Sequence, residues 1–153
     1  MKKFRFQLET LLKVTRMRKD EAELKFAEIS RRLVNQQQEL QNFLEDMQRG
    51  QKDYDQLVGA KRINIGTLMA YNSFFDWKRR QIEAQQQLIL QTRAERQRLL
   101  AELMKIMNKL KSIEQLREKR LQQYKEQLIF EEQKLLDEIG LQLYIRGQGG
   151  EGS

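Results

Sequence analysis

The chain has 153 residues, a formal net charge of +7, 33% charged residues, and no proline, cysteine or histidine. The lack of cysteine and histidine excludes disulfides, thiol and imidazole catalysis and the usual zinc ligands, so we expect no cofactor or metal. Because proline breaks helices, its absence, with a mean hydropathy of −0.79, predicts long polar helices with a thin apolar stripe.

The N-terminus carries a short basic start that is similar to the first part of a signal peptide. Polar residues follow it where an apolar segment would be required, so we do not expect a signal peptide. No apolar run reaches the roughly 18 residues that span a bilayer. We therefore expect a cytoplasmic protein that meets a membrane only peripherally or through partners.

The first predicted element is a helix over residues 4–58. From residue 22 onward, residues recur at alternating steps of three and four, which places one residue per turn along a single seam, as in a coiled coil. Two of them, Gln36 and Gly50, are interpreted as a polar register-setting residue and a local kink. The seam consists of Ala22, Phe26, Ile29, Leu33, Gln36, Leu40, Phe43, Met47, Gly50, Tyr54 and Leu57.

The next elements are a turn over residues 59–66 and a second helix over residues 67–139. Gly59, Asn64 and Gly66 supply turn-forming residues, and Thr67 is the expected N-cap of the second helix. The seam of this helix consists of Ile82, Ile89, Leu99, Leu103, Ile106, Leu110, Ile113, Tyr124, Leu128 and Leu135.

A short break between two long amphipathic helices favours an antiparallel hairpin, in which the numbers of facing residues add up to about 125. The predicted fold class is therefore all-α: one two-helix antiparallel coiled-coil hairpin over residues 1–146, with the second helix overhanging. The glycine-rich residues 147–153 are expected to form a disordered tail.

The overhang of the second helix begins near residue 121, where the first helix supplies no further partner. It carries large apolar residues, each of which contributes about 1.5–3 kcal/mol when buried, so we expect this end to insert into another protein. The alternative is a shifted register or an N-terminal segment that folds back over it. The apolar residues are Tyr124, Leu128, Ile129, Phe130, Leu135, Leu136 and Ile139.

An aromatic cluster over residues 71–78 follows the turn. Tyr71 and Phe75 fall on the seam, but Phe74 and Trp77 lie about 100° around the helix from it. Aromatic residues beside long polar side chains are typical of a docking patch, which we expect to comprise Phe74, Trp77, Lys78, Gln81 and Gln85. The alternative is that both aromatic residues pack over the turn against Ile63 and Ile65.

The basic residues are interleaved with acidic ones, even in the richest stretch from Arg93 to Arg120. This pattern is typical of a solvated helix face with exposed ion pairs, although it also allows a basic protein-binding face or, less well, a nucleic-acid-binding one. The turn glycines are not followed by Lys-Ser or Lys-Thr, so no phosphate-binding loop is present. We do not expect an enzyme.

Three segments, in order and with the break between the first and second, carry a family resemblance. The first is Phe4-Arg5-Phe6-Gln7-Leu8-Glu9-Thr10-Leu11-Leu12-Lys13-Val14, the second combines Ile65-Gly66-Thr67-Leu68 with Tyr71, Phe74, Phe75 and Ile82-Glu83-Ala84-Gln85, and the third is Leu116-Arg117-Glu118-Lys119-Arg120. All three are similar to motifs of the flagellar type III export protein family FliJ. The resemblance covers nearly the whole chain up to the glycine-rich tail.

The resemblance implies a hairpin similar to the central stalk of rotary ATPases, at the inner face of the cell membrane at the flagellar base. It implies binding to the hexameric export ATPase FliI, whose assembly and activity such proteins promote, and contacts with the export gate protein FlhA, with FliH and with export chaperones. On this interpretation Tyr124, Leu128, Phe130 and Leu135 would meet the ATPase ring, and the docking patch would meet the gate. No nucleic acid partner is expected.

Two alternatives stay open at this point. The same architecture occurs in the stalk protein of non-flagellar, injection-type secretion systems. The other alternative is a basic coiled coil that binds nucleic acid, whose affinity would depend steeply on the salt concentration.

Overall fold

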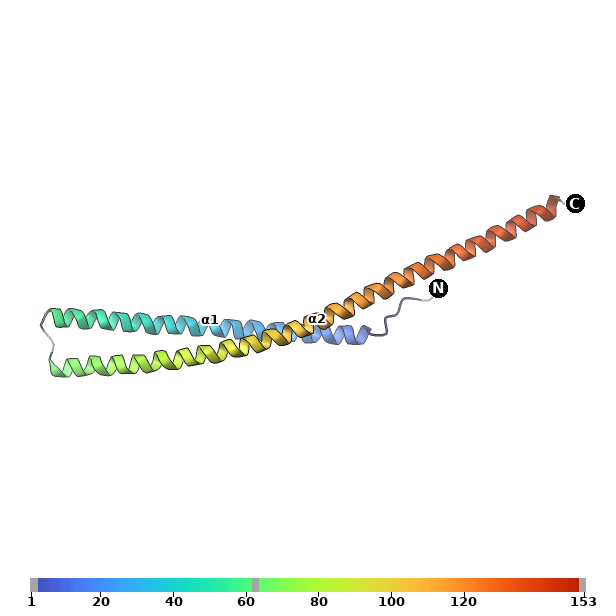
Figure 1. Cartoon of the computed structure of the whole chain (residues 1–153). Helices are drawn as coiled ribbons and strands as arrows, with labels where there is room; N and C mark the ends of the chain where they lie inside the picture. The colour runs from blue at the N-terminus through green and yellow to red at the C-terminus, as the bar shows by residue number, and fades with distance from the viewer. Residues whose placement is uncertain (1–2, 62–63, 152–153) are drawn as a thin grey trace. The chain divides into compact units, whose positions relative to one another are not determined.

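The structure, a computed structural model, describes residues 3–61 and 64–151. They form two helices, α1 (Glu9–Gly59) and α2 (Ile65–Glu151), and the described ranges contain no strand (Figure 1). The expected all-α fold, a hairpin of two long antiparallel helices, is confirmed. Over the described residues, neither helix has a stretch long and apolar enough to span a lipid bilayer.

The start of α1 differs from the predicted helix, which began at residue 4. The Glu9 amide donates to the Phe6 carbonyl at 3.1 Å and closes a turn before the helix, and the Leu12 amide donates to the Leu8 carbonyl at 2.8 Å. Phe6 is 7% exposed, and it belongs to a buried cluster with Leu12, Leu110 and Ile113. The residues before Glu9 are therefore not helical, and their aromatic side chains, Phe4 and Phe6, pack in the core of unit 1.

The turn between the helices is shorter than the predicted 59–66. α1 ends at Gly59, and Lys61 adopts a left-handed backbone conformation with φ of 54°. The side-chain oxygen of Asn64 accepts a hydrogen bond from the Thr67 amide at 2.7 Å, so Asn64, rather than Thr67, is the N-cap of α2. Residues 62–63, including Ile63 of the expected turn packing, lie outside the described residues.

The end of α2 also differs from the prediction. The helix continues to Glu151, past the expected end at residue 139 and through most of the segment expected to be a disordered tail. Glycine weakens a helix without removing a hydrogen-bond donor, and no proline is present to stop one that is already formed. Residues 152–153 of the expected tail lie outside the described residues.

The chain divides into two compact units, unit 1 (Met1–Arg18 with Ile106–Ser153) and unit 2 (Lys19–Lys105). In unit 1 a small core of buried residues joins the two helices. Its members are Phe6, Leu12, Leu110 and Ile113, with Phe4, Leu8 and Leu116 packed against them.

Unit 2 contains the turn and the parts of α1 and α2 that flank it. Its helices are joined by seam residues, of which Ile29, Phe75, Ile82, Ile89 and Leu103 are buried. All eight seam residues singled out from the sequence are buried or half-buried in their own unit; they are Leu33, Leu40, Met47, Leu57, Leu103, Ile106, Leu110 and Ile113.

The register of the hairpin follows the predicted rule. The residue numbers of contacting partners add up to about 125, as an antiparallel pairing around the turn requires. The rule holds in unit 2 for Asp46 with Lys78 and for Tyr54 with Tyr71, and in unit 1 for Phe4 with Tyr124. The alternative of a shifted register is therefore wrong. The N-terminal residues meet the start of the overhang at Tyr124 but leave the side chains from residue 129 to residue 149 exposed.

Candidate functional site

The aromatic residues that follow the turn form a cluster inside unit 2. The Tyr54 ring of α1 meets the rings of Tyr71 and Phe75 at centroid distances of 5.6 and 6.0 Å, in edge-on arrangements that suit aromatic pairs. Phe75 is 7% exposed. The prediction that Tyr71 and Phe75 are core residues agrees with these contacts.

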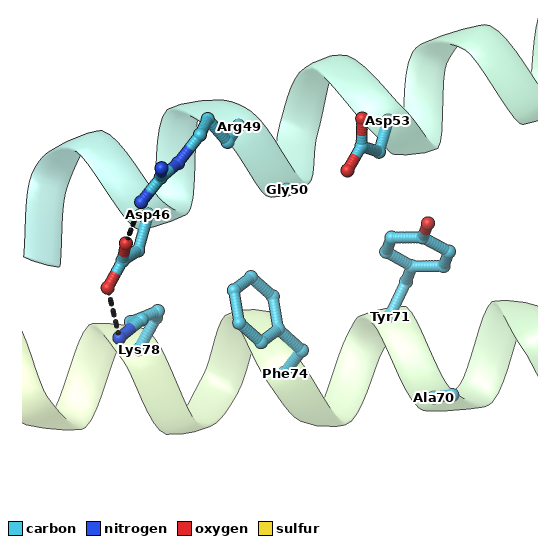
Figure 2. Close-up of a pocket in the computed structure, with 8 residues that line it drawn as sticks. All are labelled: Asp46, Arg49, Gly50, Asp53, Ala70, Tyr71, Phe74 and Lys78. Atoms are coloured by element: carbon cyan, nitrogen blue, oxygen red, sulfur yellow. Dashed lines mark hydrogen bonds and ion pairs between the residues drawn. The ribbon is translucent and has the colours of Figure 1, made fainter.

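Phe74, expected in an exposed docking patch, packs against α1 opposite Gly50 (Figure 2). A Cβ atom placed on Gly50 would lie 2.5 Å from the Cε1 atom of the Phe74 ring, well inside contact distance. The missing side chain at Gly50 thus makes room for the ring, which gives this mid-helix glycine a packing role. The ring is half-buried and does not lie over the turn.

Lys78, also assigned to the patch, is only 5% exposed. Its ammonium donates hydrogen bonds to Asp46 of α1 and to Gln81, both at 3.0 Å, and it lies 4.9 and 4.8 Å from the ring centroids of Phe43 and Trp77. An ammonium with a carboxylate, an amide and two aromatic faces around it is well compensated for burial.

Asp46 accepts hydrogen bonds from two cations, Lys78 and Arg49 (Figure 2). These bonds, that from Lys78 first, lower the pKa of the Asp46 carboxyl below its ordinary value. The carboxylate therefore stays charged at neutral pH and holds the two helices together at this level of unit 2.

The remaining patch residues divide between the two faces of α2. The Gln85 side chain donates to the backbone carbonyl of Gln36 at 2.9 Å, so it belongs to the helix interface. Trp77 is 54% exposed. The five residues thus do not form one exposed surface, since Phe74, Lys78 and Gln85 contact α1 and Trp77 faces outward.

The overhang in unit 1 has a different character. Tyr124 meets the Phe4 ring at a centroid distance of 5.7 Å, and Leu128 is half-buried. From residue 129 to residue 149 every side chain is exposed. The large apolar ones among them are Ile129, Phe130, Leu135, Leu136, Ile139, Leu141, Leu143, Tyr144 and Ile145.

The model of the flagellar FliJ protein family matches residues 4–149 of this chain. The chain belongs to that family. Membership makes this FliJ-family chain a protein related to flagellar type III export, in agreement with the resemblance of its three motifs. Neither the comparison with curated proteins nor the comparison with solved structures gives a match.

Charge divides unit 1 of this FliJ-family chain into two parts. Residues 3–18 and 106–124, which form the two-helix part, carry ten basic and three acidic residues, whereas residues 125–149 carry three basic and five acidic ones. Two ion pairs cross between the helices, Arg117 with Glu9 at 3.0 Å and Arg16 with Glu114 at 3.5 Å. The two-helix part therefore presents a basic surface, and the overhang presents an apolar and acidic one.

Two contacts of the site were missed at the sequence level, Asp46 with Lys78 and Gly50 with Phe74. Both pairs satisfy the rule that the numbers of facing residues add up to about 125, so the rule contained the signal. The argument for an exposed patch outweighed it, because Lys is usually exposed and Phe74 lies beside the seam rather than on it.

Proposed function

We propose that this chain is a non-catalytic coupling protein of the flagellar export apparatus, and that its overhang docks into the hexameric ring of the export ATPase FliI. Bound there, it would stabilise the assembled ring and promote ATP hydrolysis. One observation carries the proposal: from Ile129 to Ile145 the overhang exposes nine large apolar side chains in the described structure. Exposed apolar patches of this extent mark interaction sites.

The energetic argument concerns what a partner would gain by covering the overhang. Phe130 is 68% exposed, Leu136 62% and Tyr144 62%. Covering such a side chain, about one third of which is already buried, contributes about 1–2 kcal/mol, so most of the nine together offset the roughly 4–15 kcal/mol that association costs. The basic surface of residues 3–18 and 106–124 would favour a partner that carries acidic residues beside its binding site.

The proposal extends to the membrane side of the apparatus. The part of unit 2 near the turn would engage the export gate protein FlhA, with Trp77 as the exposed aromatic anchor and Gln81 beside it. Contacts with FliH and with export chaperones belong to the same proposal. They would hold the protein in the cytoplasm at the inner face of the cell membrane, at the flagellar base.

The central test titrates the full chain into FliI while ATP hydrolysis and oligomer mass are followed together. We expect both to rise and to saturate near one copy of the chain per hexamer. Leu136→Asp, in the overhang, is expected to remove most of the stimulation. Leu24→Asp is the matched control, because Leu24 is 65% exposed but lies in unit 2. Absence of stimulation by the unmodified chain, or equal loss in both variants, would refute ring docking by the overhang.

The gate contact has its own test. Trp77→Ala is expected to weaken binding to the cytoplasmic part of FlhA about tenfold, as the loss of an aromatic anchor does. Calorimetry measures the affinity, and far-UV circular dichroism checks that the hairpin stays folded. A double change of Phe74 and Trp77 is less clean, because Phe74 packs against α1. Unchanged affinity in Trp77→Ala would remove the gate contact from the proposal.

The two alternative functions have less support. Membership in the flagellar FliJ family favours the flagellar system over an injection-type one. Nucleic acid binding is disfavoured because acidic residues interrupt the basic surface, as in the pairs Arg117–Glu9 and Arg16–Glu114. A salt-dependent affinity for duplex DNA, with the steep slope of counterion release, would reverse that judgement.

A further inference from the structure

A groove on the surface of unit 2 lies beside Gly50, and we call it the Gly50 groove. Its volume of about 470 Å³ is at the lower end of the range for ligand clefts and leaves room for one long side chain. It is lined by Asp46, Arg49, Gly50 and Asp53 of α1 and by Ala70, Tyr71, Phe74 and Lys78 of α2 (Figure 2).

The charges at the two ends of the Gly50 groove are not equivalent. At one end Asp46 is bound by both Lys78 and Arg49, so its carboxylate has its partners. At the other end Asp53 is exposed and makes no hydrogen bond or ion pair within the part of the chain that the structure describes. Asp53 therefore supplies a carboxylate without a bonded partner at the edge of the groove, although Arg49 and Lys78 line the same groove.

The floor of the groove between these ends is aromatic. The Phe74 ring is held between Gly50 and the Phe75 ring, 5.6 Å away, and the Tyr71 ring is held by Tyr54. Figure 2 shows the Phe74 and Tyr71 rings on α2 facing the helix that carries Asp53. Aromatic faces attract cations, so the floor and the free carboxylate favour the same kind of ligand.

We propose that the Gly50 groove binds an arginine side chain of a protein partner, with the guanidinium over the Phe74 ring and paired with Asp53. A planar guanidinium stacks on an aromatic ring and bonds a carboxylate bidentately at the same time, which an ammonium does not do. Unit 2 already uses this stacking within the chain, where the guanidinium of Arg96 lies 4.8 Å from the Phe26 ring centroid. The inference rests on unit 2 alone and does not depend on ring docking by the overhang.

The test uses the full chain, isotopically labelled, and a capped Ala-Arg-Ala peptide as the probe, in buffer of low ionic strength. The backbone amide signals of Gly50 and Asp53 report on the groove in a titration followed by NMR. The control peptide carries citrulline, which keeps the shape of arginine and removes its charge. We expect saturable shifts with the arginine peptide and roughly tenfold weaker binding of the citrulline peptide, because the cation–π and charge-assisted bonds are lost.

Two variants locate the site. Asp53→Asn is expected to weaken binding of the arginine peptide about tenfold, whereas Asp55→Asn should leave it unchanged, because Asp55 bonds Gln51 and does not line the groove. Gly50→Ala should also weaken binding by displacing the Phe74 ring. The proposal is overturned if the signals do not shift, if both peptides bind equally, or if Asp53→Asn and Asp55→Asn behave alike. Circular dichroism of each variant excludes unfolding as the cause.

Discussion

Helix α2 contains two regions with opposite surroundings. Up to Leu128, residues at steps of three and four are buried or half-buried within their units, whereas from residue 129 to residue 149 every described side chain is exposed. The backbone is helical throughout. The comparison separates two causes: helical structure follows from local propensity and the lack of proline, but burial requires a second helix.

The exposed region keeps its helix because it extends one that is already formed. An isolated helix shorter than about 12–15 residues is marginal in water because nucleation is costly, whereas adding residues to an existing helix carries no such cost. Local bonds assist, as between Gln133 and Asp137 and between Gln148 and Tyr144. The overhang is therefore able to present its apolar residues in a fixed helical arrangement before any partner binds.

The largest expected effect distinguishes the two regions directly. Leu12 is fully buried in the core of unit 1, and Leu12→Ala should lower the free energy of unfolding by about 3 kcal/mol through lost burial and the cavity left behind. Leu136→Ala, at a residue that is 62% exposed, should change it by less than about 0.5 kcal/mol. Urea denaturation followed by circular dichroism measures both. Comparable losses in the two variants would mean that the overhang is covered in solution, for example by a second copy.

Much of the fold was predictable because one pattern determines it. The three-and-four spacing and the break near Gly59 set the register, and the register then places Tyr54 opposite Tyr71. The pattern also predicts where α2 no longer has facing residues, because the N-terminal residues that meet Tyr124 are the last that can pair with it. The exposure of the overhang was predictable for the same reason.

The details that were not predictable depend on the balance between local helix propensity and packing between the helices. Phe4 and Phe6 have no sequence signal against a helix, yet their packing in unit 1 delays the start of α1 to Glu9. Lys78 lies on the seam, and its residue type suggests exposure until Asp46 is recognised as its partner across the interface. The candidate site was therefore less predictable than the fold, because its structure depends on contacts between single pairs of residues, whereas the fold depends on a pattern repeated along the chain.

A smaller effect concerns the charged pair in unit 2. The pKa of Asp46 is lowered in the folded state from its ordinary value of 3.8, first by the hydrogen bond from Lys78. The stabilisation from this group is therefore fully present above that ordinary value and is lost as the pH falls through the lowered folded pKa. We expect Asp46→Asn to reduce stability at neutral pH and to flatten the acid limb of a stability–pH curve. An unchanged acid limb would mean that Asp46 does not contribute. Asp76→Asn, at an exposed pair with Arg79, is the control.

The smallest effect compares two mid-helix glycines, one in each region. A Cβ atom placed on Gly140 would have nothing within 4 Å, so Gly140→Ala should only add helix propensity, up to about 1 kcal/mol locally. Gly50→Ala adds the same propensity but drives a Cβ atom into the Phe74 ring, and such overpacking costs about 1–3 kcal/mol. We therefore expect opposite signs in urea denaturation and circular dichroism: slightly greater helicity for Gly140→Ala and a net loss of about 1 kcal/mol for Gly50→Ala. Gly50→Ala combined with Phe74→Leu should recover part of that loss, because a smaller side chain accepts the new methyl group. If Gly50→Ala stabilises the protein, the Phe74 ring turns aside at no cost in free energy. The paired helices around Gly50 would then accept an added methyl group as readily as the overhang does.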